Sequence, residues 1–147
     1  MGEKPNGRMT MSDCLFCKIV AGEIPSTKVY EDEKCLAFMD IGPVVQGHAL
    51  VVPKEHFANL AEATDEVAAH LICVARKIAV AQVKALGADG FNVITNQGAV
   101  AGQTVGHLHF HVIPQFAANP HKWNWEARPY GDFSEAAALA EKIRAAL

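Results

Sequence analysis

The stretch Gly106-His107-Leu108-His109-Phe110-His111-Val112-Ile113-Pro114 alternates histidine with apolar residues, and it guides the interpretation of the whole chain. Successive side chains of a β-strand point to opposite faces, so three imidazoles are expected on one face and three apolar side chains on the other. A single buried histidine is commonly a hydrogen-bonded core residue. Three histidines at strict period two instead indicate metal ligation, or nucleophilic and acid–base chemistry.

The composition is that of one globular domain. The chain has 147 residues, half of them hydrophobic, which is enough for a real core. A formal net charge of −3 provides no basic surface for long nucleic acids, although a nucleotide can still bind. No apolar run approaches the roughly twenty residues that cross a bilayer, and the amino end lacks a signal-peptide pattern. We therefore expect a cytoplasmic protein with no membrane partner.

Two segments lack the periodicity of regular structure. Residues 1–12 are polar and contain glycine and proline, so they are predicted to form a disordered tail before a domain at 13–147. Residues 116–130 contain prolines and two tryptophans without a regular pattern, and an irregular arm is expected there. Trp123 and Trp125 in this arm are candidates to cover a partner subunit or the mouth of a site.

The spacing of apolar residues predicts an α+β domain. Helices are expected at 13–21, 64–86 and 134–147, and strands at 28–31, 35–39, 48–52, 91–95 and 106–114. Asp13 and Ser134 are the expected caps of the first and last helices. Because the strands connect mostly through short turns, a five-stranded antiparallel sheet with the long helix packed on it is expected. The apolar stripe of the last helix, Leu139, Ile143 and Leu147, predicts a packing role.

The four cysteines are not expected to form disulfides in a reducing compartment. Cys35 and Cys73 lie in apolar or helical segments and are predicted to be small core residues. Cys14 and Cys17 form a Cys-x-x-Cys pair, a spacing that zinc sites share with redox dithiols.

Beyond the histidine stretch, residues 14–25, 38–41 and 47–56 complete a pattern that closely resembles the histidine triad superfamily of nucleotide hydrolases and transferases. The Cys-x-x-Cys opening and the Ile24-Pro25 turn look like the Hint branch, which groups purine nucleoside phosphoramidate hydrolases, in its bacterial zinc-carrying form. The resemblance runs from Cys14 to about Pro114. The segment that follows departs most from the short-tailed Hint pattern, and this departure bears on substrate preference.

The resemblance implies catalytic roles for four residues. His109 is implied as the nucleophile that attacks the α-phosphate of a nucleotide and forms a nucleotidyl-histidine intermediate. His111 would stabilise the charge that grows on the phosphate. Thr104 falls where the family contacts the leaving group and often has serine, and His48 matches a histidine that orients the triad.

The resemblance also implies a binding site for a purine nucleotide. Asp40 matches a carboxylate that accepts hydrogen bonds from the ribose hydroxyls. Asn96 and Gln103 fall near the phosphate. The expected slot for the base is apolar and is formed by Phe16, Ile19, Phe38 and Ile41, although ordinary core packing also explains Ile19 and Phe38.

Zinc-carrying relatives use a quartet that corresponds to Cys14, Cys17, His56 and His107. Two thiolates and two imidazoles suit tetrahedral Zn²⁺ in a closed structural site, which would tie the first helix to the sheet. His70 and His121 are left to solvent-facing or packing roles. Family members commonly dimerise, so a homodimer is implied.

The resulting hypothesis is a purine nucleoside phosphoramidate hydrolase that works through His109. A dinucleoside polyphosphate hydrolase of the same superfamily is the nearest alternative. A nucleotide-binding module with little catalysis is a second alternative, and a catalytic metal held by the three histidines is a third.

Overall fold

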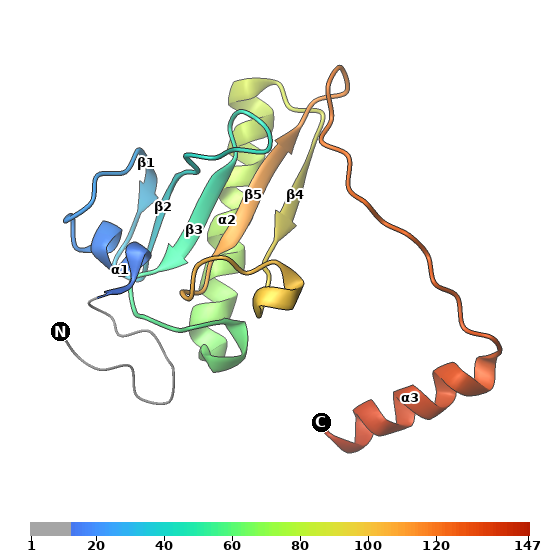
Figure 1. The fold of residues 1–147 in the computed structure, drawn as a ribbon. Coiled ribbons are helices and arrows are strands. Elements are labelled where there is room, and N and C mark those ends of the chain that lie inside the picture. The colour runs from blue at the N-terminus through green and yellow to red at the C-terminus, as the bar shows by residue number, and fades with distance from the viewer. Residues whose placement is uncertain (1–12) are drawn as a thin grey trace.

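The computed structural model describes residues 13–147, and the predicted disordered tail, residues 1–12, lies outside the described residues. The elements are α1 (Leu15–Val20), β1 (Lys28–Glu31), β2 (Cys35–Met39), β3 (Ala49–Pro53), the 3-10 turn η3 (Leu60–Glu62), α2 (Asp65–Leu86), β4 (Gly90–Ile94), the 3-10 turn η4 (Ala99–Ala101), β5 (Phe110–Gln115) and α3 (Phe133–Ala145). The strands form one antiparallel sheet in the order β1-β2-β3-β5-β4, with α2 across it (Figure 1). The predicted fold class is confirmed.

Helix α2 matches the predicted helix at 64–86 and has a capping residue at each end. The Thr64 hydroxyl accepts a hydrogen bond from the Val67 N–H at 3.2 Å, which caps the first turn. Gly87 ends the helix with a φ of +71°, a left-handed conformation that glycine adopts without strain. Between these residues a buried stripe that includes Leu71, Val74 and Ile78 packs against the sheet.

The sheet is buried on both faces because its central strands alternate apolar side chains between two clusters. On β2, Cys35 and Ala37 pack in the cluster beneath α2. Leu36 and Phe38 point the other way, into a second cluster that contains α1 residues such as Phe16. Helix α1 therefore lies against the face opposite α2, and the segment 107–109 lies in the body between them.

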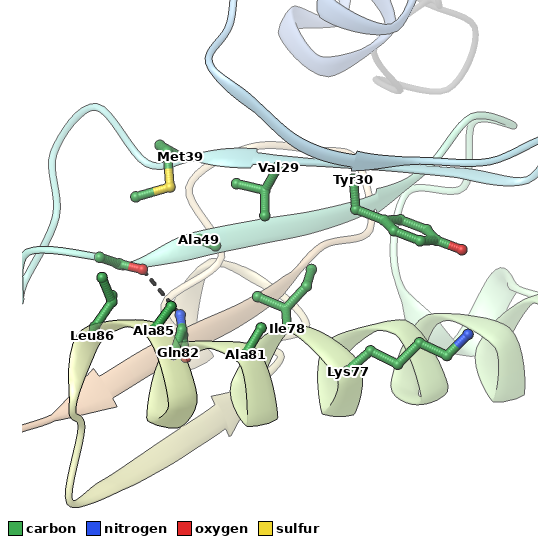
Figure 2. Close-up of a pocket in the computed structure, with 11 residues that line it drawn as sticks. Val29, Tyr30, Met39, Ala49, Lys77, Ile78, Ala81, Gln82, Ala85 and Leu86 are labelled. Carbon is green, nitrogen blue, oxygen red and sulfur yellow. Dashed lines mark hydrogen bonds between the residues drawn. The ribbon is translucent and has the colours of Figure 1, made fainter.

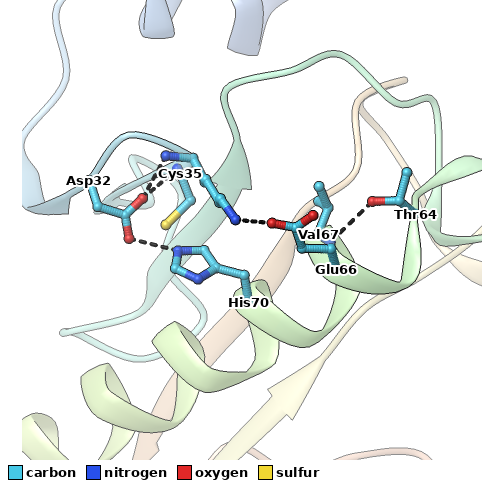
Figure 3. A network of polar contacts seen from close by, with 7 residues as sticks. Asp32, Cys35, Thr64, Glu66, Val67 and His70 are labelled. Atoms are coloured by element: carbon cyan, nitrogen blue, oxygen red, sulfur yellow. Dashed lines mark hydrogen bonds and ion pairs between the residues drawn. The ribbon is translucent and has the colours of Figure 1, made fainter.

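The turn between β1 and β2 is fastened to α2 by a polar network (Figure 3). Asp32 Oδ1 accepts from the N–H groups of Lys34 and Cys35, both at 2.8 Å, and Oδ2 lies 2.7 Å from His70 Nε2. Lys34 also forms an ion pair with Glu66 on α2. Burial raises the pKa of Asp32, but these hydrogen bonds outweigh it and hold the pKa well below its usual range. His70 is thus a structural link.

The histidine stretch is not the single strand that its periodicity predicts. Strand β5 begins only at Phe110, so His107 and His109 precede it. The reason lies in the backbone: the Leu108 N–H donates to the Phe57 carbonyl at 2.7 Å, outside the sheet ladder. The segment bends at this point, and the imidazoles face different surroundings.

Four further expectations are wrong. Cys73 is exposed on α2, whereas Cys35 is buried as predicted. Helix α1 is capped by Cys14, which has the extended backbone of an N-cap residue and accepts from the Cys17 N–H. Helix α3 is capped by Asp132, which accepts from Ser134 N–H, and this helix has no buried residue, so the predicted packing does not occur within the chain. The arm before α3 is irregular, as expected.

No helix among residues 13–147 combines the length and the apolar character that a membrane crossing needs.

Candidate functional site

Four side chains from three distant parts of the chain converge beside α1. Their potential ligand atoms, in Cys14, Cys17, His56 and His107, all lie within 4.8 Å of one another. Cys14 Sγ is 3.3 Å from His107 Nδ1, Cys17 Sγ is 3.3 Å from His56 Nδ1, and the two Nδ1 atoms are 3.1 Å apart. The structure therefore brings the predicted metal quartet together.

The chemistry of this quartet fits zinc. With Zn–S near 2.3 Å and Zn–N near 2.0–2.1 Å, tetrahedral ligands lie roughly 3.3–3.8 Å apart, close to the separations in the cluster. His107 Nε2 donates to the Pro53 carbonyl at 2.9 Å, which leaves Nδ1 as the unprotonated nitrogen facing the thiols. Burial lowers the pKa of His107 to about 4, so the ring is neutral, as a metal ligand must be.

His109 is held in a single tautomer by the backbone. Its Nδ1–H donates to the carbonyl of His107 at 2.7 Å, which leaves Nε2 unprotonated. The Thr95 hydroxyl donates to the His109 carbonyl at 2.8 Å and fixes the backbone at this position. Burial lowers the pKa of His109, which favours the neutral ring. A neutral imidazole with a free Nε2 lone pair is a competent nucleophile.

His48 sets the tautomer of His111 through a short relay. The Val44 N–H donates to His48 Nδ1 at 3.3 Å, so the proton of the neutral ring is on Nε2. That Nε2 lies 2.9 Å from His111 Nδ1 and donates to it. His111 then carries its own proton on Nε2, available as a donor in the adjoining cavities. Asp40 Oδ2 lies 3.5 Å from His48 Nε2 and can stabilise a positive charge there.

A cavity of about 220 Å³ opens in front of His109 and His111. Its apolar wall includes all four residues of the predicted base slot, Phe16, Ile19, Phe38 and Ile41. Phe16 stands edge-on to the His109 ring, with 5.1 Å between the ring centroids. Ile41 differs from the other three because its side chain is fully exposed at the mouth, whereas the others are buried.

A second cavity, of about 410 Å³, adjoins the first. The two share Asp40, Thr104 and His111 in their walls. Asn96 and Trp123 line the second cavity and are absent from the wall of the first. The shared residues therefore mark where a ligand that extends from one cavity into the other would pass the histidines.

Gln103 is the predicted site residue whose side chain is occupied elsewhere. Its Nε2 donates to the carbonyls of Ala58 and Val105, at 2.7 and 3.0 Å. Its Oε1 accepts from the Gly98 N–H at 2.9 Å. In this structure Gln103 braces the loop that carries Thr104, and its contact with phosphate stays a prediction.

Sequence reasoning missed two residues that hold the histidines. Thr95 directly follows β4. Its hydrogen bond to the His109 carbonyl depends on the pairing of β4 with β5, which no local sequence pattern reveals. Val44 acts through its backbone N–H, so its side chain carries no signal. The alternative of one metal held by three histidines finds no support, because among the described residues His109 belongs to no cluster of potential metal ligands.

Comparison with known proteins identifies the family. Residues 21–118 match the model described as the HIT domain, so the chain belongs to the HIT family. The adenosine 5′-monophosphoramidase hnt1 of Schizosaccharomyces pombe is 47% identical over 102 residues, which are 69% of this chain and 74% of that protein.

Two solved structures extend the similarity over nearly the whole chain. A HIT family protein from Bacillus anthracis has a TM-score of 0.87 and 40% identity, and the match covers 94% of this chain and 99% of that one. A Zn-bound histidine triad family protein from Mycobacterium smegmatis has a TM-score of 0.74 and 37% identity, with 92% and 99% covered. The fold and the resemblance expected from the sequence are thus confirmed.

Proposed function

We propose that this protein hydrolyses purine nucleoside phosphoramidates at the α-phosphate, through a nucleotidyl intermediate on His109. The observation that carries the proposal is the hydrogen bond of 2.7 Å from His109 Nδ1–H to the His107 carbonyl, because it leaves Nε2 as the nucleophilic nitrogen at a cavity. The activity named for the S. pombe relative supports the same chemistry.

The first half-reaction replaces the amine by the imidazole. His109 Nε2 attacks the α-phosphorus, a P–N bond to the ring forms, and the P–N bond to the amine breaks. The amine leaves with a proton that comes from solvent and is relayed through the Thr104 hydroxyl, which lies where the two cavities meet. The ring gains positive charge in this step, and the His107 carbonyl that accepts its Nδ1–H stabilises that charge.

The second half-reaction returns the enzyme to its starting state. Water attacks the same phosphorus, the bond to His109 Nε2 breaks, and the nucleoside monophosphate leaves, while the proton from water passes to solvent. In both steps the Nε2–H of His111 donates to a phosphate oxygen, since His48 fixes that tautomer. Asn96, in the wall of the adjoining cavity, would donate from its amide to the same phosphate.

The nucleoside would lie in the smaller cavity. Its base would pack among Phe16, Ile19 and Phe38, and its ribose hydroxyls would donate to Asp40. Asp40 Oδ1 already accepts from the Gly42 N–H at 2.8 Å, which orients the carboxylate.

Zinc is proposed for the quartet described above, where it would be a structural ion that ties α1 to the segment before β5. The Zn-bound relative supports this assignment. We also propose a cytoplasmic homodimer, as the family resemblance implies.

Turnover of matched substrates tests the function. We expect adenosine and guanosine 5′-phosphoramidates to be hydrolysed, with His109→Gln slower by at least about 10³-fold. His70→Gln, on α2 beside the β1–β2 turn and outside both cavities, should stay within about twofold of wild type. Equal turnover by wild type and His109→Gln would refute the assignment of His109 as the nucleophile.

Two other outcomes select the alternatives. Faster cleavage of a bridged dinucleotide would favour a dinucleoside polyphosphate hydrolase, whose second nucleoside could occupy the second cavity. Tight binding of AMP without turnover would favour a nucleotide-binding module.

A further inference from the structure

Helix α3 stands apart from the rest of the protein. It lies at the end of an extended arm, away from the sheet and from α2 (Figure 1), and none of its residues is buried. A helix of this length is only marginally stable alone in water, because nucleation is costly and most helical stability comes from packing of an apolar face. The isolated position of α3 therefore requires a surface to pack on.

The helix has a well-defined apolar face. With about 100° between successive residues, Phe133, Leu139 and Ile143 lie on one side together with Ala136 and Ala140. The three large side chains are 94%, 46% and 64% exposed. The polar side carries Glu141, Lys142 and Ser134, so α3 has the pattern of a helix that docks on an apolar surface.

The body of the protein offers a matching surface, which we call the α2 groove. It is a cavity of about 340 Å³ between α2 and the sheet (Figure 2). Its lining is formed by Val29, Tyr30, Met39, Gly47, Ala49, Lys77, Ile78, Ala81, Gln82, Ala85 and Leu86. Small alanines along one side let a neighbouring helix approach closely, and Lys77 is the charged residue of this lining.

We propose that α3 docks in the α2 groove of a second copy of this chain. The arm, residues 116–132, spans roughly 55 Å when extended, enough to cross from one subunit body to another. Glu135 lies beside the apolar face, one turn before Leu139, and has the charge opposite to Lys77 in the groove.

Reciprocal exchange makes the contact large enough to be specific. Helix α3 is about 20 Å long, and one such face alone is small for an interface. When two copies exchange helices, each buries one helix face and one groove, which brings the contact toward the roughly 800 Å² per partner of a stable complex. The structure of a single chain then shows α3 detached because its docking surface belongs to the partner.

Photo-cross-linking locates the docked helix. The full chain is prepared with Leu139→p-benzoylphenylalanine, and ¹⁵N-labelled and unlabelled batches are refolded together. We expect cross-links to peptides that contain Lys77 to Leu86, in pairs with one labelled and one unlabelled member. The same group at Glu141, on the polar side, should give few of them. Cross-links only within one chain, to other surfaces, or none at all would overturn the proposal.

A matched pair of substitutions tests the energetics. Ala140→Asp places a charge on the apolar face, and Ala138→Asp makes the same change on the opposite side of the helix. By analytical ultracentrifugation, Ala140→Asp should raise the dimer dissociation constant at least tenfold, which is about 1.4 kcal/mol, and Ala138→Asp should leave it unchanged. A monomeric wild type, equal effects of the two variants, or no effect of either would overturn the proposal.

Discussion

The segment 107–111 carries histidines at both ends, and the histidines at its two ends lie in different chemical surroundings. His107 faces two thiols and a second imidazole in a closed cluster, whereas His109 and His111 face cavities. In each ring a hydrogen bond to one nitrogen decides what the other nitrogen can do: the Pro53 carbonyl holds Nε2 of His107, and the His107 carbonyl holds Nδ1 of His109. The role of a histidine thus follows from its tautomer and its neighbours.

The two settings are coupled through one carbonyl and one helix. The His107 side chain belongs to the cysteine cluster, but its backbone carbonyl orients His109. Phe16, between the two cysteines on α1, packs edge-on against His107 and His109. We therefore expect that changes around His109 and His111 leave the zinc site intact, whereas loss of the zinc site also disturbs His109.

Loss of a thiol should have the largest effect. Cys17→Ser removes one of four ligands, so zinc should be lost and the free energy of unfolding should fall by at least about 3 kcal/mol. Cys73→Ser, at an exposed thiol, should change it by less than about 0.5 kcal/mol. Zinc content by elemental analysis and urea unfolding measure both. A full complement of zinc in Cys17→Ser would contradict the assignment of Cys17 as a zinc ligand.

Loss of the hydrogen bond from His48 to His111 should slow catalysis without loss of zinc. His48→Leu removes the Nε2–H donor to His111, and we expect kcat to fall about 10- to 100-fold with little change in KM. His48→Gln keeps a donor near the position of Nε2 and should recover most of the rate. Steady-state kinetics with a phosphoramidate measures this, and equal rates in the two variants would contradict the relay.

The smallest effect is a dependence of stability on pH. Burial, and to a smaller extent His109 and His48, lower the pKa of His111 to about 4, whereas an unfolded histidine titrates near 6.5. Between these values the unfolded chain binds the extra proton, so the free energy of unfolding is highest above pH 6.5 and falls as the pH drops toward 4.

Comparison of pH 7 with pH 4.5 isolates this contribution. Urea unfolding of His111→Asn should lose less stability between the two pH values than wild type, by about 1–2 kcal/mol after allowance for the partial exposure of the ring. An identical loss in the two proteins would contradict the assignment.

Local sequence signals predicted most of the fold and much of the site. The predicted helix at 64–86 agrees with α2 to within one residue, and the predicted strands at 28–31 and 35–39 have the bounds of β1 and β2. The metal quartet and the residues around the cavity followed from the family pattern. What failed depended on contacts between distant segments: Phe57 bends the histidine stretch, and Thr95 holds His109 across a strand pair.

The C-terminal segment shows a second limit of the sequence. The spacing of Leu139 and Ile143 correctly predicted an amphipathic helix, and packing was the natural inference. Periodicity shows that a face is apolar, but it does not specify which surface covers that face. In this structure the face is exposed, so a packing partner has to be sought outside the chain.

Trapping the intermediate is the most direct test of the central claim. Wild-type protein is mixed with adenosine 5′-phosphoramidate, quenched within the first turnover and digested for peptide mass spectrometry under conditions that preserve phosphorus–nitrogen bonds. We predict an adenylyl group on the peptide that contains His107 to His111, localised to His109, and no adduct in His109→Gln. An adduct that persists in His109→Gln, or lies on His111, would contradict the account.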